Sequence, residues 1–162
     1  MGGKNSSTVR RVDEEGIRGR SEQVQDKGKV MNEQRGDRES KATVCVVDDE
    51  PEIGDIVRRA LERRYDVDVF ESAHQLLSEL DDGRRYDVVL CDLYMPGMSG
   101  EEVARRLADQ WPEQAKSLVL MSGASTDRGG PGDVEGFDGP MLQKPFRLAV
   151  LRETVSSVAG ND

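Results

Sequence analysis

From residue 43 onward, short apolar runs alternate with longer stretches in which apolar and polar residues are mixed. The short runs are nearly continuous in Val, Leu, Cys and Met, which is typical of strands that are buried on both faces of a sheet. They cover residues 43–47, 67–70, 87–91, 117–121 and 140–143. The run at 67–70 alternates with aspartate and predicts a half-exposed strand, and the last run is short and weakly marked.

The mixed stretches between these runs repeat apolar residues at helical spacing. The first predicted helix begins near Pro51, because proline suits the first turn of a helix. The next two begin at Ser72 and Ser99, each followed three residues later by Gln or Glu, which is a capping-box pattern. Pro112 is expected to end the third helix, and a last helix follows from Leu148.

This order of strands and helices predicts an α/β fold with a doubly wound, five-stranded parallel sheet covered on both faces. One connection departs from the pattern, because residues 126–136 contain four glycines and a proline. These residues oppose a regular helix. We therefore expect a degenerate fourth helix, as an irregular loop with at most one or two turns.

The first part of the chain has a different composition from the rest. Residues 1–41 are polar, and their few aliphatic residues are spaced on neither a helical nor a strand face. We expect a disordered N-terminal tail over 1–41 and a folded domain over 42–160. The alternative is a short helix near residues 20–35 that docks on a partner.

Charge and composition narrow the classes of function. Residues 1–41 carry 10 Lys and Arg against 8 Asp and Glu, whereas residues 42–162 carry 13 against 24. Such an acidic domain is a poor partner for nucleic acid, so no direct nucleic-acid binding is expected. No signal peptide or apolar run of about 20 residues is present, so membrane insertion is not expected either. Cys45 and Cys91 fit core positions, and a reduced, cytoplasmic protein is the expectation.

Polar residues follow four of the predicted strands at their carboxyl ends. Asp48 and Asp49 follow the first strand, Asp92 the third and Ser122 the fourth, and Lys144 lies just beyond the fifth. In an open parallel sheet these ends form one rim, which is where ligands bind. Each residue alone is weak evidence, since any of them fits a turn or a helix cap. Their occurrence together, each at the carboxyl end of its own predicted strand, is what indicates a functional site.

Three carboxylates at one rim predict a cation site. Carboxylates held a few ångströms apart repel each other, and a bound divalent ion removes that repulsion. Hard oxygen ligands without a nearby His or Cys favour Mg²⁺ over zinc. Mg²⁺ commonly shares its ligand shell with phosphate oxygens. A carboxylate with an ordinary pKa near ~3.9 is ionised at pH 7, so Asp92 could attack phosphorus and form an aspartyl phosphate.

The same residues resemble the receiver domain of two-component response regulators. The matching segments are VVDDEP at 46–51, DLYMPGMSG at 92–100, MSG at 121–123 and KPF at 144–146. The intervals from Asp49 through Asp92 and Ser122 to Lys144 are 43, 30 and 22 residues, as that family expects. The resemblance covers about residues 42–160 and implies a CheY-like, flavodoxin-like sheet of order 2-1-3-4-5.

The resemblance also implies roles for individual residues. Asp92 would accept a phosphoryl group from a sensor histidine kinase or a phosphotransfer protein. Asp49, Asp92 and the backbone carbonyl of Tyr94 would bind Mg²⁺, and Asp48 would do so through water. The chain would catalyse only its own phosphorylation and dephosphorylation, so it would not be an enzyme in the usual sense.

Ser122 and Lys144 would contact the transferred phosphoryl group, again by the family's pattern. The result would be a single-domain switch or phosphorelay intermediate acting on a downstream protein that the sequence does not identify. Two features depart from the family. Met141 stands where an aromatic residue usually reports phosphorylation, and residues 126–136 replace the usual fourth helix. These two departures put in question how phosphorylation would be signalled to a partner protein. They leave the phosphorylation chemistry itself intact.

The sequence leaves two alternative functions open. An aspartate-nucleophile phosphatase of the haloacid dehalogenase type also uses Asp, Ser or Thr, Lys and Mg²⁺. That family places a second Asp two residues after its nucleophile, where this chain has Tyr94 after Asp92. A pseudo-receiver that binds a partner without being phosphorylated is the other alternative, and the complete set of acids argues against it.

Overall fold

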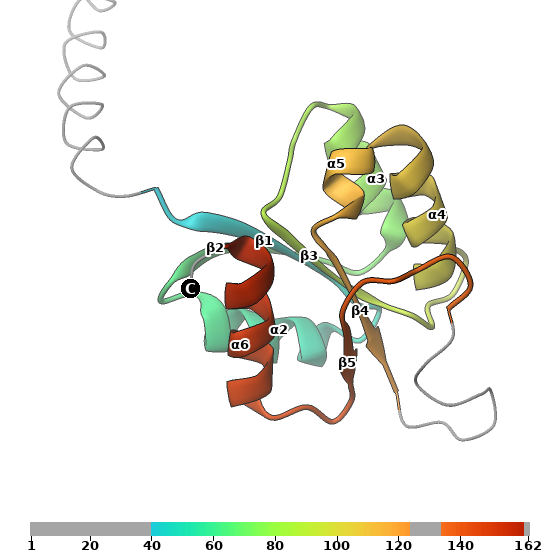
Figure 1. Cartoon of the computed structure of the whole chain (residues 1–162). Coiled ribbons are helices and arrows are strands. Elements are labelled where there is room, and N and C mark those ends of the chain that lie inside the picture. Colours follow the sequence, from blue (N-terminus) through green and yellow to red (C-terminus); the bar gives the residue numbers. More distant parts are fainter. Residues whose placement is uncertain (1–39, 124–133, 161–162) are drawn as a thin grey trace, which may run out of the picture. The chain divides into compact units, whose positions relative to one another are not determined.

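The structure, a computed structural model, describes residues 40–123 and 134–160 (Figure 1). The tail predicted over 1–41 falls almost wholly outside these residues, as does most of the predicted irregular loop at 126–136. Within the described part of that connection, residues 134–140 form turns and bends and no helix.

The predicted parallel sheet is confirmed, with five strands in the order β2-β1-β3-β4-β5. The strands are β1 (Ala42–Val47), β2 (Tyr65–Phe70), β3 (Val88–Asp92), β4 (Leu118–Ser122) and β5 (Met141–Gln143). All four pairings are parallel. The central strands β1, β3 and β4 consist mainly of buried residues, because helices cover both faces of the sheet.

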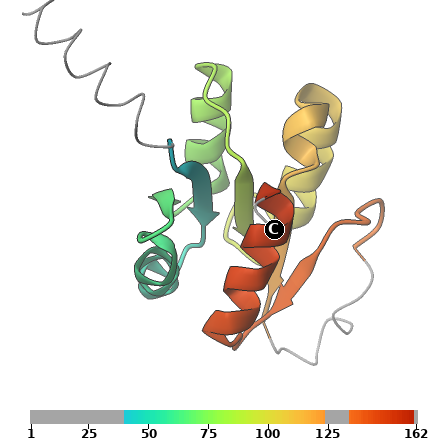
Figure 2. The same cartoon turned by 60° about the vertical axis from the view of Figure 1, so that its left-hand side comes forward.

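Helices pack on each face of the sheet (Figures 1 and 2). The helices are α2 (Pro51–Leu61), α3 (Ala73–Asp81), α4 (Gly100–Gln110), α5 (Pro112–Ala115) and α6 (Leu148–Ala159). α2 and α6 cover one face, and α3, α4 and α5 cover the other. Both predicted capping boxes are present at Ser72 and Ser99, where the serine hydroxyl accepts from the backbone N–H three residues later.

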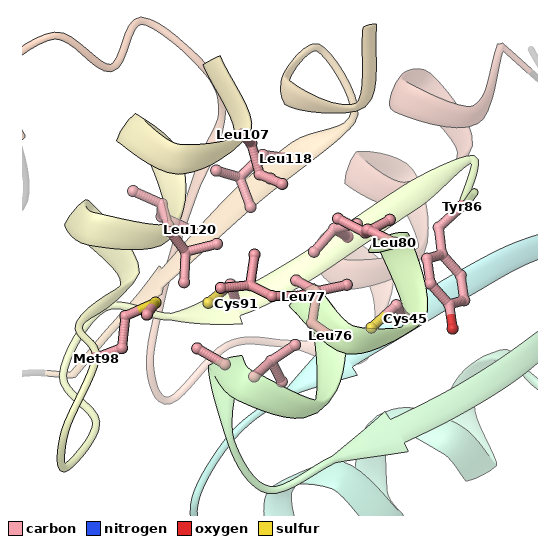
Figure 3. Close-up of a cluster of buried hydrophobic side chains, with 14 of the residues drawn as sticks. Cys45, Leu76, Leu77, Leu80, Tyr86, Cys91, Met98, Leu107, Leu118 and Leu120 are labelled. Carbon is pink, nitrogen blue, oxygen red and sulfur yellow. The ribbon is translucent and has the colours of Figure 1, made fainter. Parts of the chain in front are cut away.

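The two faces bury separate hydrophobic clusters. Alternate residues of each central strand point to opposite sides, so Cys45 belongs to one cluster and Val46 to the other. Figure 3 shows the cluster under α3 and α4, where Leu76, Leu80 and Leu107 meet strand residues such as Cys91. Both cysteines are buried as free thiols among these side chains, as the sequence predicts.

The prediction that Pro112 ends the third helix is correct for α4 but incomplete. α4 ends at Gln110 with Trp111 as its C-cap, and Pro112 then occupies the first turn of the short helix α5. Proline suits that position because its missing N–H would be unpaired there anyway. Among the described residues, no helix is long and apolar enough to cross a membrane.

Candidate functional site

The carboxyl ends of β1 and β3 bring three aspartates together. Asp48 and Asp49 follow directly on β1, and Asp92 is the last residue of the neighbouring strand β3. Carboxylate oxygens of these three residues all lie within 4.8 Å of one another. The predicted convergence of acids from separate strands is therefore present in the structure.

Asp48 is the most enclosed member of the group and is fully buried. Its Oδ1 accepts a hydrogen bond of 2.9 Å from the backbone N–H of Glu50, at the entrance to α2. Its Oδ2 lies 2.6 Å from the Lys144 ammonium. A buried carboxylate is costly unless it is paired in this way, so Asp48 and Lys144 stabilise each other.

Asp92 sits at the centre of the rim and is 5 % exposed. It is in register with Met121 of β4, and the next backbone N–H, that of Leu93, donates to the Met121 carbonyl. Burial raises the pKa of Asp92 to about 6; Lys144 lowers this pKa, and the charge of Asp48 raises it. The ordinary value near ~3.9 assumed from the sequence is thus too low, although at pH 7 the group is still mostly ionised.

Lys144 reaches the two buried aspartates from just beyond β5. Its ammonium lies 3.4 Å from Asp92 Oδ1 as well as 2.6 Å from Asp48 Oδ2. Its backbone N–H donates to the Ser122 carbonyl over 2.7 Å, which continues the pairing of β4 with β5. Burial lowers the pKa of Lys144, but the hydrogen bond to Asp48 and the charges of both aspartates outweigh it and raise the pKa above its ordinary value.

Ser122 and Tyr94 flank the aspartates at different degrees of exposure. Ser122 is buried at the end of β4, one residue beyond the register partner of Asp92, and its hydroxyl donates to the Gly123 carbonyl over 3.4 Å. The Tyr94 backbone N–H donates to the Asp92 carboxylate and lowers its pKa, while Tyr94 as a whole is 39 % exposed. All the residues singled out from the sequence thus lie along this rim.

The donor set suits a hard divalent cation. It offers carboxylate oxygens from Asp48, Asp49 and Asp92, with Asp49 exposed to solvent and the other two buried. Mg²⁺ prefers such oxygen ligands and keeps several waters, which an exposed Asp49 permits. The residues present therefore fit Mg²⁺, with the Lys144 ammonium as the competing positive charge.

Gly100 also supports the site, although it is not among the site residues predicted from the sequence. A Cβ on Gly100 would lie 2.6 Å from the Asp92 carbonyl oxygen and 2.8 Å from the Leu93 Cα. The first turn of α4 can approach the end of β3 only because this position has no side chain. A glycine directly after the capping Ser99 was the available signal, but only the fold reveals what lies against it.

A family profile described as the response regulator receiver domain matches residues 44–156. This chain belongs to the response regulator receiver family. The receiver domain is 35 % identical over 118 residues to the transcriptional regulatory protein TcrA of Mycobacterium tuberculosis, covering 70 % of this chain and 44 % of TcrA. It is 30 % identical over 122 residues to ResD of Bacillus subtilis, covering 72 % of this chain and 48 % of ResD.

Solved structures agree on the fold of the receiver domain. A sensor protein from Polaromonas sp. JS666 superimposes with a TM-score of 0.64 at 21 % identity, covering 74 % of this chain and 97 % of that one. The chain spans less than half the length of TcrA and ResD. Receiver domains are phosphorylation-dependent switches of two-component signalling rather than enzymes in the usual sense, and they generally bind Mg²⁺ at an acidic pocket.

Proposed function

We propose that this receiver domain accepts a phosphoryl group on Asp92, with Mg²⁺ bound, from the phosphohistidine of a sensor kinase or a phosphotransfer protein. The observation that carries the proposal is the meeting of Asp48, Asp49 and Asp92 at one rim of the sheet, with Lys144 beside Asp48 and Asp92. Asp92 is the central residue of this group, because it ends the strand that lies in the middle of the sheet. Asp48, which lies closer to Lys144, is fully buried.

The chemistry requires an ionised carboxylate next to positive charge. With a pKa of about 6, Asp92 is mostly ionised at pH 7 and can attack phosphorus. An oxygen–phosphorus bond forms as the phosphorus–nitrogen bond to the donor histidine breaks, and the imidazole leaves with the electron pair. When bound by Asp49, Asp92 and the Tyr94 carbonyl, and by Asp48 through water, Mg²⁺ would neutralise charge on the phosphoryl oxygens.

Lys144 and Ser122 would complete the site around the phosphoryl group. The Lys144 ammonium already lies 3.4 Å from Asp92 Oδ1, so a short movement brings it to a phosphoryl oxygen. In doing so it would leave Asp48, whose carboxylate then becomes available to the metal. The Ser122 hydroxyl, now donating to a backbone carbonyl over 3.4 Å, could instead donate to the phosphoryl group.

The change of partners at Lys144 and Ser122 would shift an equilibrium between two states of the domain, and a downstream protein would bind one of them. The chain would serve either as such a switch or as a phosphorelay intermediate. The folded part that does this is proposed to span residues 42–160.

A mass measurement tests the acceptor. The full chain is incubated with acetyl phosphate and Mg²⁺, and intact mass is recorded. Wild type and the matched control Asp109→Asn, which changes an exposed aspartate on α4, should gain one phosphoryl group, and Asp92→Asn should gain none. A stable phosphoryl adduct on Asp92→Asn would place the acceptor elsewhere. No adduct on wild type would favour a partner-binding module without phosphorylation.

A further inference from the structure

A pocket lined by arginines lies at the opposite end of the sheet from the aspartates. It has a volume of about 490 Å³ and is lined by Ala60, Leu61, Arg63, Arg64, Tyr65 and Arg152. Tyr65 pairs with Ala42, the first residue of β1, whereas the acidic site follows the last residue of that strand. The arginine pocket is therefore separate from the phosphoryl site.

Part of the positive charge around this pocket has a structural purpose. α2 ends here, and its last carbonyls lack partners within the helix. The Arg152 Nε, from α6, donates to the Ala60 carbonyl over 3.1 Å, and the Lys41 ammonium donates to the Glu62 carbonyl over 3.0 Å. Both cations also complement the negative end of the helix dipole. This accounts for Lys41 and for one nitrogen of Arg152.

Arg63 and Arg64 have no such role. Both are exposed, and among the described residues neither forms an ion pair or a side-chain hydrogen bond. Three other exposed arginines in the described part of the chain pair with acids: Arg58 with Asp55, Arg84 with Asp68 and Arg105 with Glu101. Arg59, Arg106 and Arg147 do not pair with an acid in that part of the chain, but none of those three lines the pocket. At the pocket, three arginines line one hollow, and none of its lining residues in the described part of the chain is an acid.

This concentration of positive charge contrasts with the rest of the domain. Residues 42–162, with the three pocket arginines included, carry 13 Lys and Arg against 24 Asp and Glu. Like charges held together repel each other, and an anion seated between them removes that repulsion. Guanidinium groups match the geometry of phosphate with paired N–H donors, and Arg152 is already fixed in orientation by its bond to Ala60.

We propose that the arginine pocket binds a small polyanion that carries phosphate groups, through Arg63, Arg64 and Arg152. A volume of about 490 Å³ suits a ligand of this size, since small-molecule pockets span roughly 300–1,000 Å³. A compact anion touches only the pocket, whereas a nucleic acid would run along the acidic remainder of the surface and be repelled. This inference does not depend on phosphorylation of Asp92.

Isothermal titration of the full chain with inorganic tripolyphosphate tests the proposal. EDTA keeps divalent ions away from both the probe and the aspartates. Wild type should bind one tripolyphosphate, and the double variant Arg63→Gln/Arg64→Gln should bind it at least about ten-fold more weakly. The control Arg105→Gln/Arg106→Gln removes the same charge from α4 and should stay within about two-fold of wild type.

Three further measurements show whether tripolyphosphate binds at the arginine pocket. The Arg63 and Arg64 side chains are exposed and pair with no acid in the described part of the chain, so the double variant should melt like wild type in circular dichroism. Asp92→Asn should bind tripolyphosphate as wild type does; a large change there would place the probe at the phosphoryl site and overturn the proposal. If both double variants lost the same affinity for tripolyphosphate, binding would depend on general positive charge and not on the pocket, and the proposal would be overturned. Equally tight binding of a single-stranded oligonucleotide would overturn it in the same way.

Discussion

Two opposing effects set the pKa of Asp92: burial raises it, and the nearby charge of Lys144 lowers it. Burial raises its pKa to about 6, and the ammonium of Lys144 at 3.4 Å offsets part of that effect. A carboxyl group whose pKa is raised in the folded state costs stability once it ionises. That cost is absent well below pH ~4, where the group is protonated in both states, grows as pH rises toward 6, and is complete above the folded pKa.

Asp92→Asn should therefore stabilise the fold at neutral pH. In EDTA at pH 7.5 we expect the free energy of unfolding to rise by roughly 1–3 kcal/mol, because a neutral amide avoids the cost of ionisation. The gain should shrink by about half at pH 5, where Asp92 in the folded protein is mostly protonated. Urea unfolding at both pH values measures this gain in the free energy of unfolding, with Asp109→Asn as the control.

A gain that is independent of pH, or a loss of stability at pH 7.5, would contradict this account. In that case the attraction between Asp92 and Lys144 would outweigh the burial of the carboxylate.

At the scale of elements, hydrophobic periodicity predicted each strand to within one or two residues. The prediction for the third strand, 87–91, compares with Val88–Asp92 in the structure. The second strand begins earlier than predicted, at Tyr65, whose side chain is buried at one end of the sheet. Tyr65 continues the alternation of Val67 and Val69 with aspartates, so the period-2 pattern reaches back to Tyr65 and the predicted strand began two residues too late.

Contacts between distant segments were beyond the reach of the sequence. The α5 side chain Gln114 is buried and pairs with the Tyr86 backbone in both directions, accepting from its N–H and donating to its carbonyl. Nothing local marks this glutamine as buried, since the residue that it bonds lies 28 residues away. The rim residues could each be identified from the sequence. The bond between Lys144 and Asp48 could not be foreseen, because these two residues are also far apart in the chain.

The junction of β3 with α4 gives a test at this scale. In Gly100→Ala, the added methyl group would approach the Asp92 carbonyl oxygen to 2.6 Å and the Leu93 Cα to 2.8 Å, and neither backbone atom can easily move. We expect destabilisation of about 1–3 kcal/mol, because overpacking against backbone forces the two elements apart. Phosphorylation by acetyl phosphate should also slow, since Asp92 ends the displaced strand.

Gly123→Ala is the matched control for stability, because a Cβ there meets no atom of the described residues within 4 Å. Unfolding in urea compares the two variants. Equal stability of Gly100→Ala and wild type would mean that α4 can withdraw from β3 at no cost.

For the whole molecule, the hydrophobic clusters bear on where the folded domain begins. Both clusters are built from residues between Ala42 and Ala159, and the receiver match spans 44–156. Deleting residues 1–40 should therefore change the melting temperature by no more than about 2 °C and leave the rate of phosphorylation by acetyl phosphate within about two-fold. Circular dichroism and intact mass measure the two quantities. A much larger drop in melting temperature would mean that the first 40 residues help to stabilise the fold.

The central sheet separates the molecule into two packed halves that share only their strands. Val47 and Cys91 face α3 and α4, and Met121 faces α2 and α6, although all three are close to the aspartates. Substitutions far apart and without common neighbours add in their effects. Over evolution, either side could thus be reshaped for a new binding partner while the opposite side, and the chemistry at the rim between them, stayed as it was.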